Sequence, residues 1–225
     1  MSGIFLASPT PNTNENPQTK LENTEETTQG NTSADTIENL ENNEAVQASN
    51  TVTPEDLLGH FPYEEVSSSE LTAISADGQL KLRHAAAEKF KQMQAAAIAD
   101  GVLLTPISAF RSISEQDYLF FRVKEQRVQA ATTRAEVSAP PGYSEHHTGY
   151  AIDIGDGKVP SANVNVKFEE TAAFHWLEAN AAKYSFELSF PRNNPQGISY
   201  EPWHWRFVGD RHSLETFYKA RHLEE

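Results

Sequence analysis

A sharp change in composition near residue 53 limits what this chain can fold into. Residues 1–52 contain almost no aromatic residues and are crowded with Asn, Thr, Glu, Gln and Pro. Such a segment has too little apolar surface to offset the conformational entropy lost on folding. We therefore expect residues 1–52 to be a disordered acidic low-complexity tail or linker. Residues 53–225 are long enough to bury a core and are expected to form the folded domain.

Charge and cysteine content narrow the possible partners. The formal net charge of the chain is −14, and residues 1–52 contribute half of it, with eight acidic side chains against Lys20 alone. Because phosphate groups attract basic patches, we expect no binding to nucleic acid or to anionic membrane surfaces. The absence of Cys excludes disulfides, thiol catalysis and cysteine-based zinc sites. No stretch approaches the ~20 apolar residues of a transmembrane segment, and no signal peptide is visible near Met1.

Hydrophobic periodicity predicts an α+β fold for residues 53–225, with a small antiparallel sheet flanked by helices. Apolar residues recur at helical spacing or alternate as in strands, and Gly, Pro and Asp mark the breaks between these segments. One helix is expected to start at residue 53, and further helices are expected over 80–99, 114–134, 168–183 and 212–221. Strands are expected over 102–110, 150–154, 186–190 and 203–208, with a hairpin loop over 191–197.

Two segments carry side chains typical of a metal centre. His146 and Asp153 lie in the segment SEHHTGYAID (residues 144–153), and His204 ends the segment EPWH that begins at Glu201. Two imidazoles and a carboxylate make a three-ligand zinc set that leaves one coordination position open for water. Glu201 is a further carboxylate that can accept the proton of that water. This combination predicts a zinc hydrolase.

Alternation along the strand expected at 203–208 orients the second segment. His204 and Arg206 should share one face of this strand, and the aromatic residues next to them should share the other. Pro202 favours extended backbone at Glu201, and a turn there can bring the Glu201 carboxylate toward the cleft that His204 faces. We therefore expect His204 and Glu201 to act at the same site.

Spacing alone leaves the choice between His146 and His147 open. On a regular strand His147 and Asp153 would share a face, and His146 would not. Gly149 allows a break in the backbone between them, which would reset this alternation. Periodicity therefore allows either histidine to be the ligand.

Three motifs occur in order along the chain. They are SAFRS at residues 108–112 with Gln116, Ser-x-His-x-x-Gly-x-Ala-x-Asp at 144–153, and Glu-x-Trp-His at 201–204. Together they resemble the zinc D-alanyl-D-alanine carboxypeptidases of the VanY type, a family of bacterial enzymes that trim peptidoglycan stem peptides. The resemblance extends from about residue 57 to the end of the chain and implies a hedgehog-like zinc fold.

The resemblance implies how the metal centre would work. It places the first ligand at His146, so that one Zn2+ per chain would be held by His146, Asp153 and His204. Glu201 would accept a proton from the attacking water and return it to the leaving amine. His147 would then be a neighbour that packs or forms a hydrogen bond.

Arg111 is the second catalytic candidate. A guanidinium at a strand end can bind a substrate carboxylate or stabilise the oxyanion of a hydrolysed amide, and the matching arginine of the resembling family does so. A plain surface ion pair is the alternative for Arg111. Further substrate contacts are expected from Ser108, Gln116, Ser144 and Trp203.

The resemblance also implies a substrate and a location. We expect a monomer that hydrolyses the terminal D-Ala of peptidoglycan stem peptides, in the periplasm or at the cell envelope. The tail at residues 1–52 would suit a tether between a membrane anchor and a wall-facing domain, and a solvated tail without a partner is the alternative.

Two other functions remain open on the sequence. Zinc chemistry does not specify the residues on either side of the cleaved bond, so an L,D-carboxypeptidase or an endopeptidase on peptidoglycan peptides is the first alternative. The second is a non-enzymatic binding module stabilised by zinc, because the related hedgehog signalling domains are similar around their zinc. The intact Glu201 argues against this second alternative.

Overall fold

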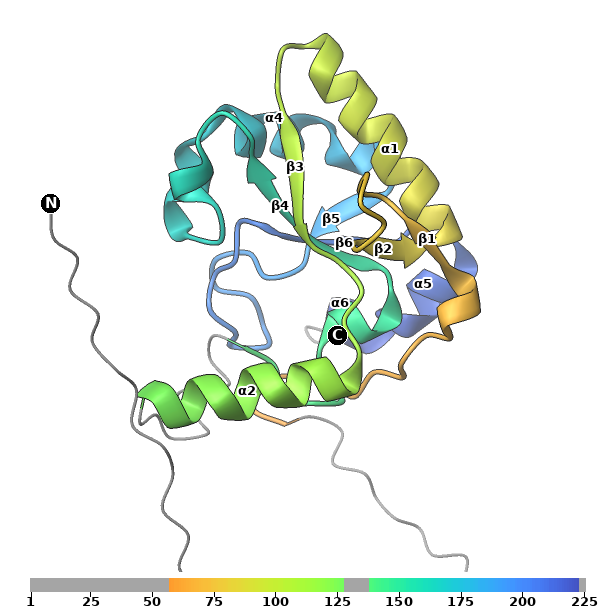
Figure 1. The fold of residues 1–225 in the computed structure, drawn as a ribbon, viewed down its shortest axis with the longest axis vertical. Coiled ribbons are helices and arrows are strands. Elements are labelled where there is room, and N and C mark those ends of the chain that lie inside the picture. The colour runs from red at the N-terminus through yellow and green to blue at the C-terminus, as the bar shows by residue number, and fades with distance from the viewer. Residues whose placement is uncertain (1–56, 128–137, 223–225) are drawn as a thin grey trace, which may run out of the picture. The chain divides into compact units, whose positions relative to one another are not determined.

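A four-stranded antiparallel sheet lies at the centre of the folded domain, with the strand order β3-β4-β6-β5 (Figure 1). The strands are β3 Leu104–Ser108, β4 Ala151–Asp156, β5 Phe186–Leu188 and β6 His204–Phe207. All neighbouring strands pair antiparallel, and β4 is buried along its whole length. The predicted α+β fold with a small antiparallel sheet is confirmed.

The computed structural model describes residues 57–127 and 138–222. The expected tail at residues 1–52, the helix start at residue 53 and the end of the helix expected at 114–134 lie outside these ranges. Where the first of these helices would continue, Leu57 and His60 form an isolated β-bridge instead. Among the described helices, none combines the length and the hydrophobicity needed to cross a membrane.

Helices pack beside the sheet and complete the core. The helices are α1 His84–Ala99, α2 Ile113–Arg127, α4 Ala172–Asn180, α5 Arg211–Thr216 and α6 Tyr218–Arg221. Buried residues of α1 and α4 join those of the strands in one hydrophobic cluster. In Figure 1, α2 lies apart from the sheet and follows the stretch of chain that leaves β3. The helix expected over 212–221 is present as α5 and α6, because it is split at Phe217.

A two-stranded sheet precedes α1, and the sequence patterns did not predict it. β1 (Leu71–Ala73) pairs antiparallel with β2 (Lys81–Arg83). The helix predicted over 80–99 therefore begins only at His84, because residues 81–83 are extended and paired. Strands of three residues are too short to show alternation in a sequence.

The single helix predicted over 168–183 was wrong, because three separate segments occupy this part of the chain. A 3-10 segment, η4 (Val166–Glu170), ends at Thr171, whose backbone is extended and whose hydroxyl caps α4. The carboxylate of Asp156 on β4 also accepts a hydrogen bond from the backbone of α4, at 3.2 Å. A second 3-10 segment, η5 (Ala181–Tyr184), follows α4. Apolar periodicity continues across these breaks, whereas the cap at Thr171 that creates the first of them depends on a polar side chain outside the pattern.

Candidate metal centre and active site

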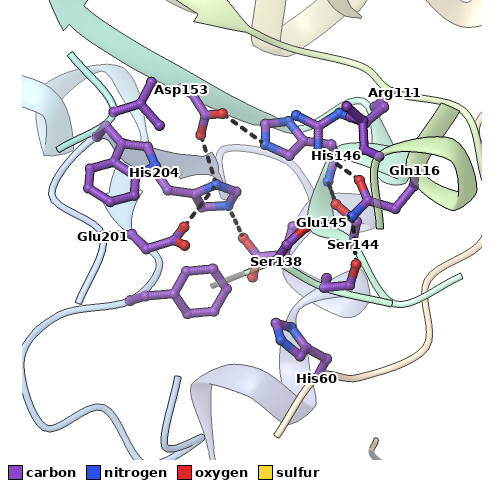
Figure 2. A pocket seen from close by; sticks show the side chains of 15 residues that line it. His60, Arg111, Gln116, Ser138, Ser144, Glu145, His146, Asp153, Glu201 and His204 are labelled. Atoms are coloured by element: carbon purple, nitrogen blue, oxygen red, sulfur yellow. Dashed lines mark hydrogen bonds and ion pairs between the residues drawn. The ribbon is translucent and has the colours of Figure 1, made fainter. Parts of the chain in front are cut away.

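The pairing of β4 with β6 brings two of the predicted ligands together. Asp153 on β4 and His204 on β6 are direct cross-strand partners, and residues so paired project to the same face of a sheet. The Asp153 carboxylate lies 3.0 Å from Nδ1 of His204 through one oxygen, and 3.3 Å from Nε2 of His146 through the other. Figure 2 shows the three side chains converging on one wall of a pocket.

A short 3-10 segment, η2 (Glu145–Thr148), delivers His146 to this cluster. Ser144 caps the segment through its hydroxyl, and Gly149 ends it with a left-handed backbone (φ 71°). The residues around His146 are therefore helical rather than extended, so strand alternation does not apply to them. This geometry puts His146 beside Asp153.

His147 lies outside the cluster, and its ring forms hydrogen bonds to backbone groups. Its Nδ1 donates to the carbonyl of Arg111 at 2.7 Å, and its Nε2 accepts from the backbone N–H of Gly142 at 3.1 Å. Both ring nitrogens are therefore used in holding neighbouring chain segments together. His146 therefore lies in the cluster and His147 lies outside it, a choice that spacing had left open.

The three candidate ligands form a buried set. One nitrogen or oxygen atom from each of His146, Asp153 and His204 lies within 4.8 Å of the others, and all three residues are buried. Burial would raise the pKa of Asp153, but the two imidazoles hold it below its usual range. Burial lowers the pKa of His146, and its Nδ1 hydrogen bonds at 2.7 Å to the carbonyl of Ala109, which leaves Nε2 facing Asp153.

Glu145 is a buried acidic residue that the sequence analysis missed. Its carboxylate contacts Nε2 of His204 at 3.0 Å, Nη1 of Arg206 at 2.8 Å and the hydroxyl of Ser189 at 2.7 Å. His204 and Arg206 do share one face of β6, as strand alternation predicts, and Glu145 is what they both contact. A cation expected on a buried strand face was the signal that could have pointed to a partner carboxylate.

Glu201 lies on the turn that leads into β6. Its carboxylate is 3.9 Å from Nδ1 of His204, and its backbone N–H donates to the carbonyl of Phe190 at 3.1 Å. Burial raises the pKa of Glu201 to about 7, although the nearby His204 acts in the opposite direction. A carboxyl group with such a pKa can both accept and donate a proton near neutral pH.

Arg111 follows β3, and neutral side chains fix its guanidinium. Nη1 donates to the side-chain oxygen of Gln116 at 2.7 Å, and Nη2 donates to the hydroxyl of Ser108 at 2.8 Å. Gln116 is itself held by the carbonyl of Ala139 at 2.5 Å. Because these partners carry no charge, the positive charge of Arg111 remains available to an anionic group in the pocket.

One cavity of about 230 Å³ joins these groups. Its lining residues include the three candidate ligands together with Glu201, Arg111, Gln116, Ser144 and Trp203. Ser108 is not among the lining residues and contacts Arg111 from behind. His60 and Phe190 also line the cavity, with their rings 6.5 Å apart in an edge-on arrangement, and sequence patterns had not marked either residue.

Comparison with known proteins identifies the family. Residues 79–210, more than half of the chain, match the family model VanY, described as D-alanyl-D-alanine carboxypeptidase. The chain belongs to the VanY family. The predicted resemblance is therefore confirmed, and the motifs that carry it fall inside the matched region.

This chain matches only part of the length of its curated relatives. A D-alanyl-D-alanine carboxypeptidase of Enterococcus faecium is 34% identical over 152 residues, which are 66% of this chain and 45% of the relative. The putative carboxypeptidase YodJ of Bacillus subtilis (strain 168) is 36% identical over 132 residues, which are 58% of this chain and 47% of the relative. The chain thus spans about half the length of the curated relatives it matches.

Solved structures share the VanY-family fold. The LdcB LD-carboxypeptidase aligns with a TM-score of 0.57 and 31% identity, over 68% of this chain and 73% of that one. A variant of the D,D-pentapeptidase VanY from the VanB-type resistance cassette, in complex with Zn(II), aligns with a TM-score of 0.52 and 26% identity, over 66% of this chain and 84% of that one.

Proposed function

We propose that this chain is a zinc-dependent D-alanyl-D-alanine carboxypeptidase that removes the terminal D-Ala of peptidoglycan stem peptides. One observation carries the proposal: the buried set of His146, Asp153 and His204 shares a single cavity with Glu201 and Arg111. The proposal is supported by the Enterococcus faecium relative, which is itself a D-alanyl-D-alanine carboxypeptidase.

The donor set fits zinc. Two imidazoles and one carboxylate make a three-ligand catalytic site, and in a tetrahedral site with bonds of ~2.0–2.1 Å the donor atoms lie roughly 3.3 Å apart. The Asp153 carboxylate lies 3.0 Å and 3.3 Å from the two histidine nitrogens through a different oxygen in each case, and one donor atom from each of the three residues lies within 4.8 Å of the others. A bound zinc ion would supply a Lewis acid for the scissile carbonyl and for the attacking water.

Glu201 is the proposed proton carrier of the reaction. Its place beside His204 and inside the cavity allows it to take a proton from water that attacks the scissile carbonyl. The same carboxyl group then donates this proton to the leaving amine of D-Ala. Burial raises the pKa of Glu201, which favours the protonated form that donates to the leaving amine.

Arg111 is the proposed anchor for negative charge. Gln116 and Ser108 hold its guanidinium in a fixed orientation, so little conformational entropy is lost when an anion binds. The terminal carboxylate of a stem peptide and the oxyanion formed during hydrolysis are both suitable partners.

An L,D-carboxypeptidase is the second candidate, and the alignment with the LdcB LD-carboxypeptidase favours it. Both activities would use the same metal, base and arginine. They differ in the residue that precedes the terminal D-Ala, which is D-Ala in a pentapeptide and an L-residue in a tetrapeptide.

Release of D-Ala from synthetic peptides by the zinc-loaded protein tests the proposal. We expect cleavage of a pentapeptide that ends in D-Ala-D-Ala, with slower cleavage of the tetrapeptide and of the free dipeptide. A preference for the tetrapeptide would instead establish the L,D activity. Zinc binding without cleavage of any of the three peptides would support the non-enzymatic binding module.

The substrate would also set the place of action. Stem peptides belong to the cell wall, so we propose that the protein acts in the periplasm or elsewhere in the cell envelope. We further propose that it acts as a monomer, since the proposed mechanism requires no group from a second copy.

A further inference from the structure

A second buried carboxylate lies behind the metal cluster, and the proposed mechanism does not use it. The side chain of Glu145 is only 2% exposed and does not belong to the His146, Asp153 and His204 set. Figure 2 shows His204 between Asp153 on one side and Glu145 on the other. The two carboxylates contact different nitrogens of the same ring, Nδ1 for Asp153 and Nε2 for Glu145.

We propose that Glu145 is a positioning residue that fixes the orientation of His204 for metal binding. A neutral imidazole has a single N–H donor and a single nitrogen lone pair. If Nε2 donates to Glu145, the lone pair is on Nδ1, which faces Asp153 and the cavity. The inference rests on the proposed function in one respect, namely that the cluster binds zinc.

The two histidines of the cluster would then use opposite nitrogens. His146 has its Nδ1 on the carbonyl of Ala109, so Nε2 is left for the metal, whereas His204 has its Nε2 on Glu145. Metal-binding histidines commonly donate their second N–H to a carboxylate or a backbone carbonyl, which fixes the ring. Here each kind of partner holds one ring.

Glu145 also ties together the two chain segments that carry the histidines. It directly precedes His146 on η2, and its carboxylate contacts His204 and Arg206 on β6. Ser189, which follows β5, donates to the same oxygen that His204 contacts. The Glu145 side chain therefore holds η2 beside β6 and at the same time fixes the orientation of the His204 ring.

Arg206 provides the countercharge that makes a buried carboxylate tolerable beside the cluster. Its guanidinium is 5% exposed and contacts Glu145 at 2.8 Å and Glu187 at 2.9 Å. Glu187 shares Arg206 with Glu145, and among the described residues its carboxylate contacts Arg206 and Arg221 rather than His204. Glu187 therefore offers a matched control, because its loss weakens the Arg206 contacts without changing the partner of His204.

Zinc affinity in Glu145→Gln and Glu187→Gln tests the inference. We expect the zinc Kd, measured by competition with a chelator, to rise roughly 10–100-fold in Glu145→Gln, as is typical when the partner of a metal-binding histidine is altered, because the neutral amide accepts from Nε2 more weakly than a carboxylate and can turn its NH2 group to the ring instead. The visible spectrum of the cobalt-substituted protein should change as well, because it reports ligand geometry. Glu187→Gln should keep the wild-type Kd and spectrum. A folded Glu145→Gln protein with wild-type Kd and spectrum would overturn the inference.

A measurement on the unchanged protein covers the case in which Glu145→Gln does not fold. Nitrogen-15 NMR of the histidine rings in the zinc-loaded wild type should show His204 protonated at Nε2, and protonation at Nδ1 would overturn the inference. The proposed function fails separately. If the wild type binds zinc more tightly than Glu145→Gln, as expected, but releases no D-Ala, the proposed activity is contradicted and the role of Glu145 is supported.

Discussion

Glu201 and His204 are three positions apart, yet the structure gives them different surroundings. His204 is enclosed by two carboxylates, whereas Glu201 keeps 15% of its side chain exposed and lines the cavity. Metal binding and proton transfer are therefore assigned to groups that can be altered one at a time. This separation makes the mechanism testable by single substitutions.

Glu201→Gln should retain zinc and lose turnover. The amide keeps the shape of the side chain but cannot accept the proton, and loss of a general base typically lowers the rate about 10²–10⁴-fold. Zinc content and kcat on the pentapeptide should be measured on the same preparation. Turnover near that of the wild type would contradict the proposed hydrolytic mechanism.

Substitution of the ligands should separate the two adjacent histidines. His146→Ala and His204→Ala each remove one of the three proposed metal ligands, so the zinc content of the purified protein should fall sharply. His147→Ala should keep its zinc, because this ring is bound to the backbone at Arg111 and Gly142. Elemental analysis measures this difference. Equal loss of zinc in His147→Ala would show that the ligand assignment is wrong.

Arg111 predicts a requirement for a free carboxylate on the substrate. Amidation of the pentapeptide C-terminus would leave the half-buried charged donor Arg111 without its anionic partner, which costs about 3 kcal/mol, or roughly a hundredfold in kcat/KM. Arg111→Ala should cleave both peptides at similarly low rates, because the discriminating group is gone. If the wild type cleaves the free-acid and amidated peptides equally well, the carboxypeptidase assignment fails and an endopeptidase is favoured.

At the scale of elements, the end of η2 is the most constrained point of the site. Gly149 has φ 71°, and a Cβ added there would meet side-chain atoms of Val66 and Leu71 at 3.1 Å and of Arg83 at 3.2 Å. Gly78 has nearly the same φ, 72°, with no atom within 4 Å of an added Cβ. The two glycines therefore share the backbone requirement and differ in crowding.

This pair of glycines gives a controlled prediction. Gly78→Ala should lower the free energy of unfolding by about 1–2 kcal/mol, the cost of a left-handed backbone for a residue with a side chain. Gly149→Ala should lower it further, because three neighbouring side chains must move. Urea unfolding of both variants measures the difference. Equal destabilisation would mean that the packing around η2 adjusts without cost.

Local patterns predicted some elements of the site and missed others for physical reasons. Alternation on β6 correctly placed His204 and Arg206 on one face, because a strand period depends only on neighbouring residues. The choice between His146 and His147 depended on a 3-10 segment that no periodicity in the sequence predicts. The partners of Glu145 come from β6 and the residue after β5, so only the tertiary structure reveals its role.

At the scale of the whole molecule, the sheet gathers the site from distant parts of the chain. Ser108, Asp153 and His204 occupy successive neighbouring strands and are paired across them. The carboxylates of Asp153, Glu145 and Glu201 all lie close to His204. Such a concentration of buried negative charge favours the folded state more strongly when a cation is bound than when it is absent.

Zinc should therefore stabilise the protein against thermal unfolding. A ligand at 100 times its Kd adds about 2.7 kcal/mol, which corresponds to roughly 5–10 °C in Tm for a domain of this size. Scanning calorimetry with zinc and with a chelator measures the shift. Glu201→Gln should retain the shift and His204→Ala should lose it. A shift that persists in His204→Ala would indicate that zinc binds elsewhere.

The direct pairing of Asp153 with His204 also limits how this fold can change by insertion and deletion. One residue added within β4 or β6 would turn the side chains beyond it to the opposite face and break up the ligand set. The loops that connect the strands are free of this restriction outside the short segments that carry Arg111, His146 and Glu201, because a longer connection has only a small entropic cost. Relatives can therefore differ widely in the lengths of these connections. Within a strand, only insertions or deletions of an even number of residues keep every side chain on its present face.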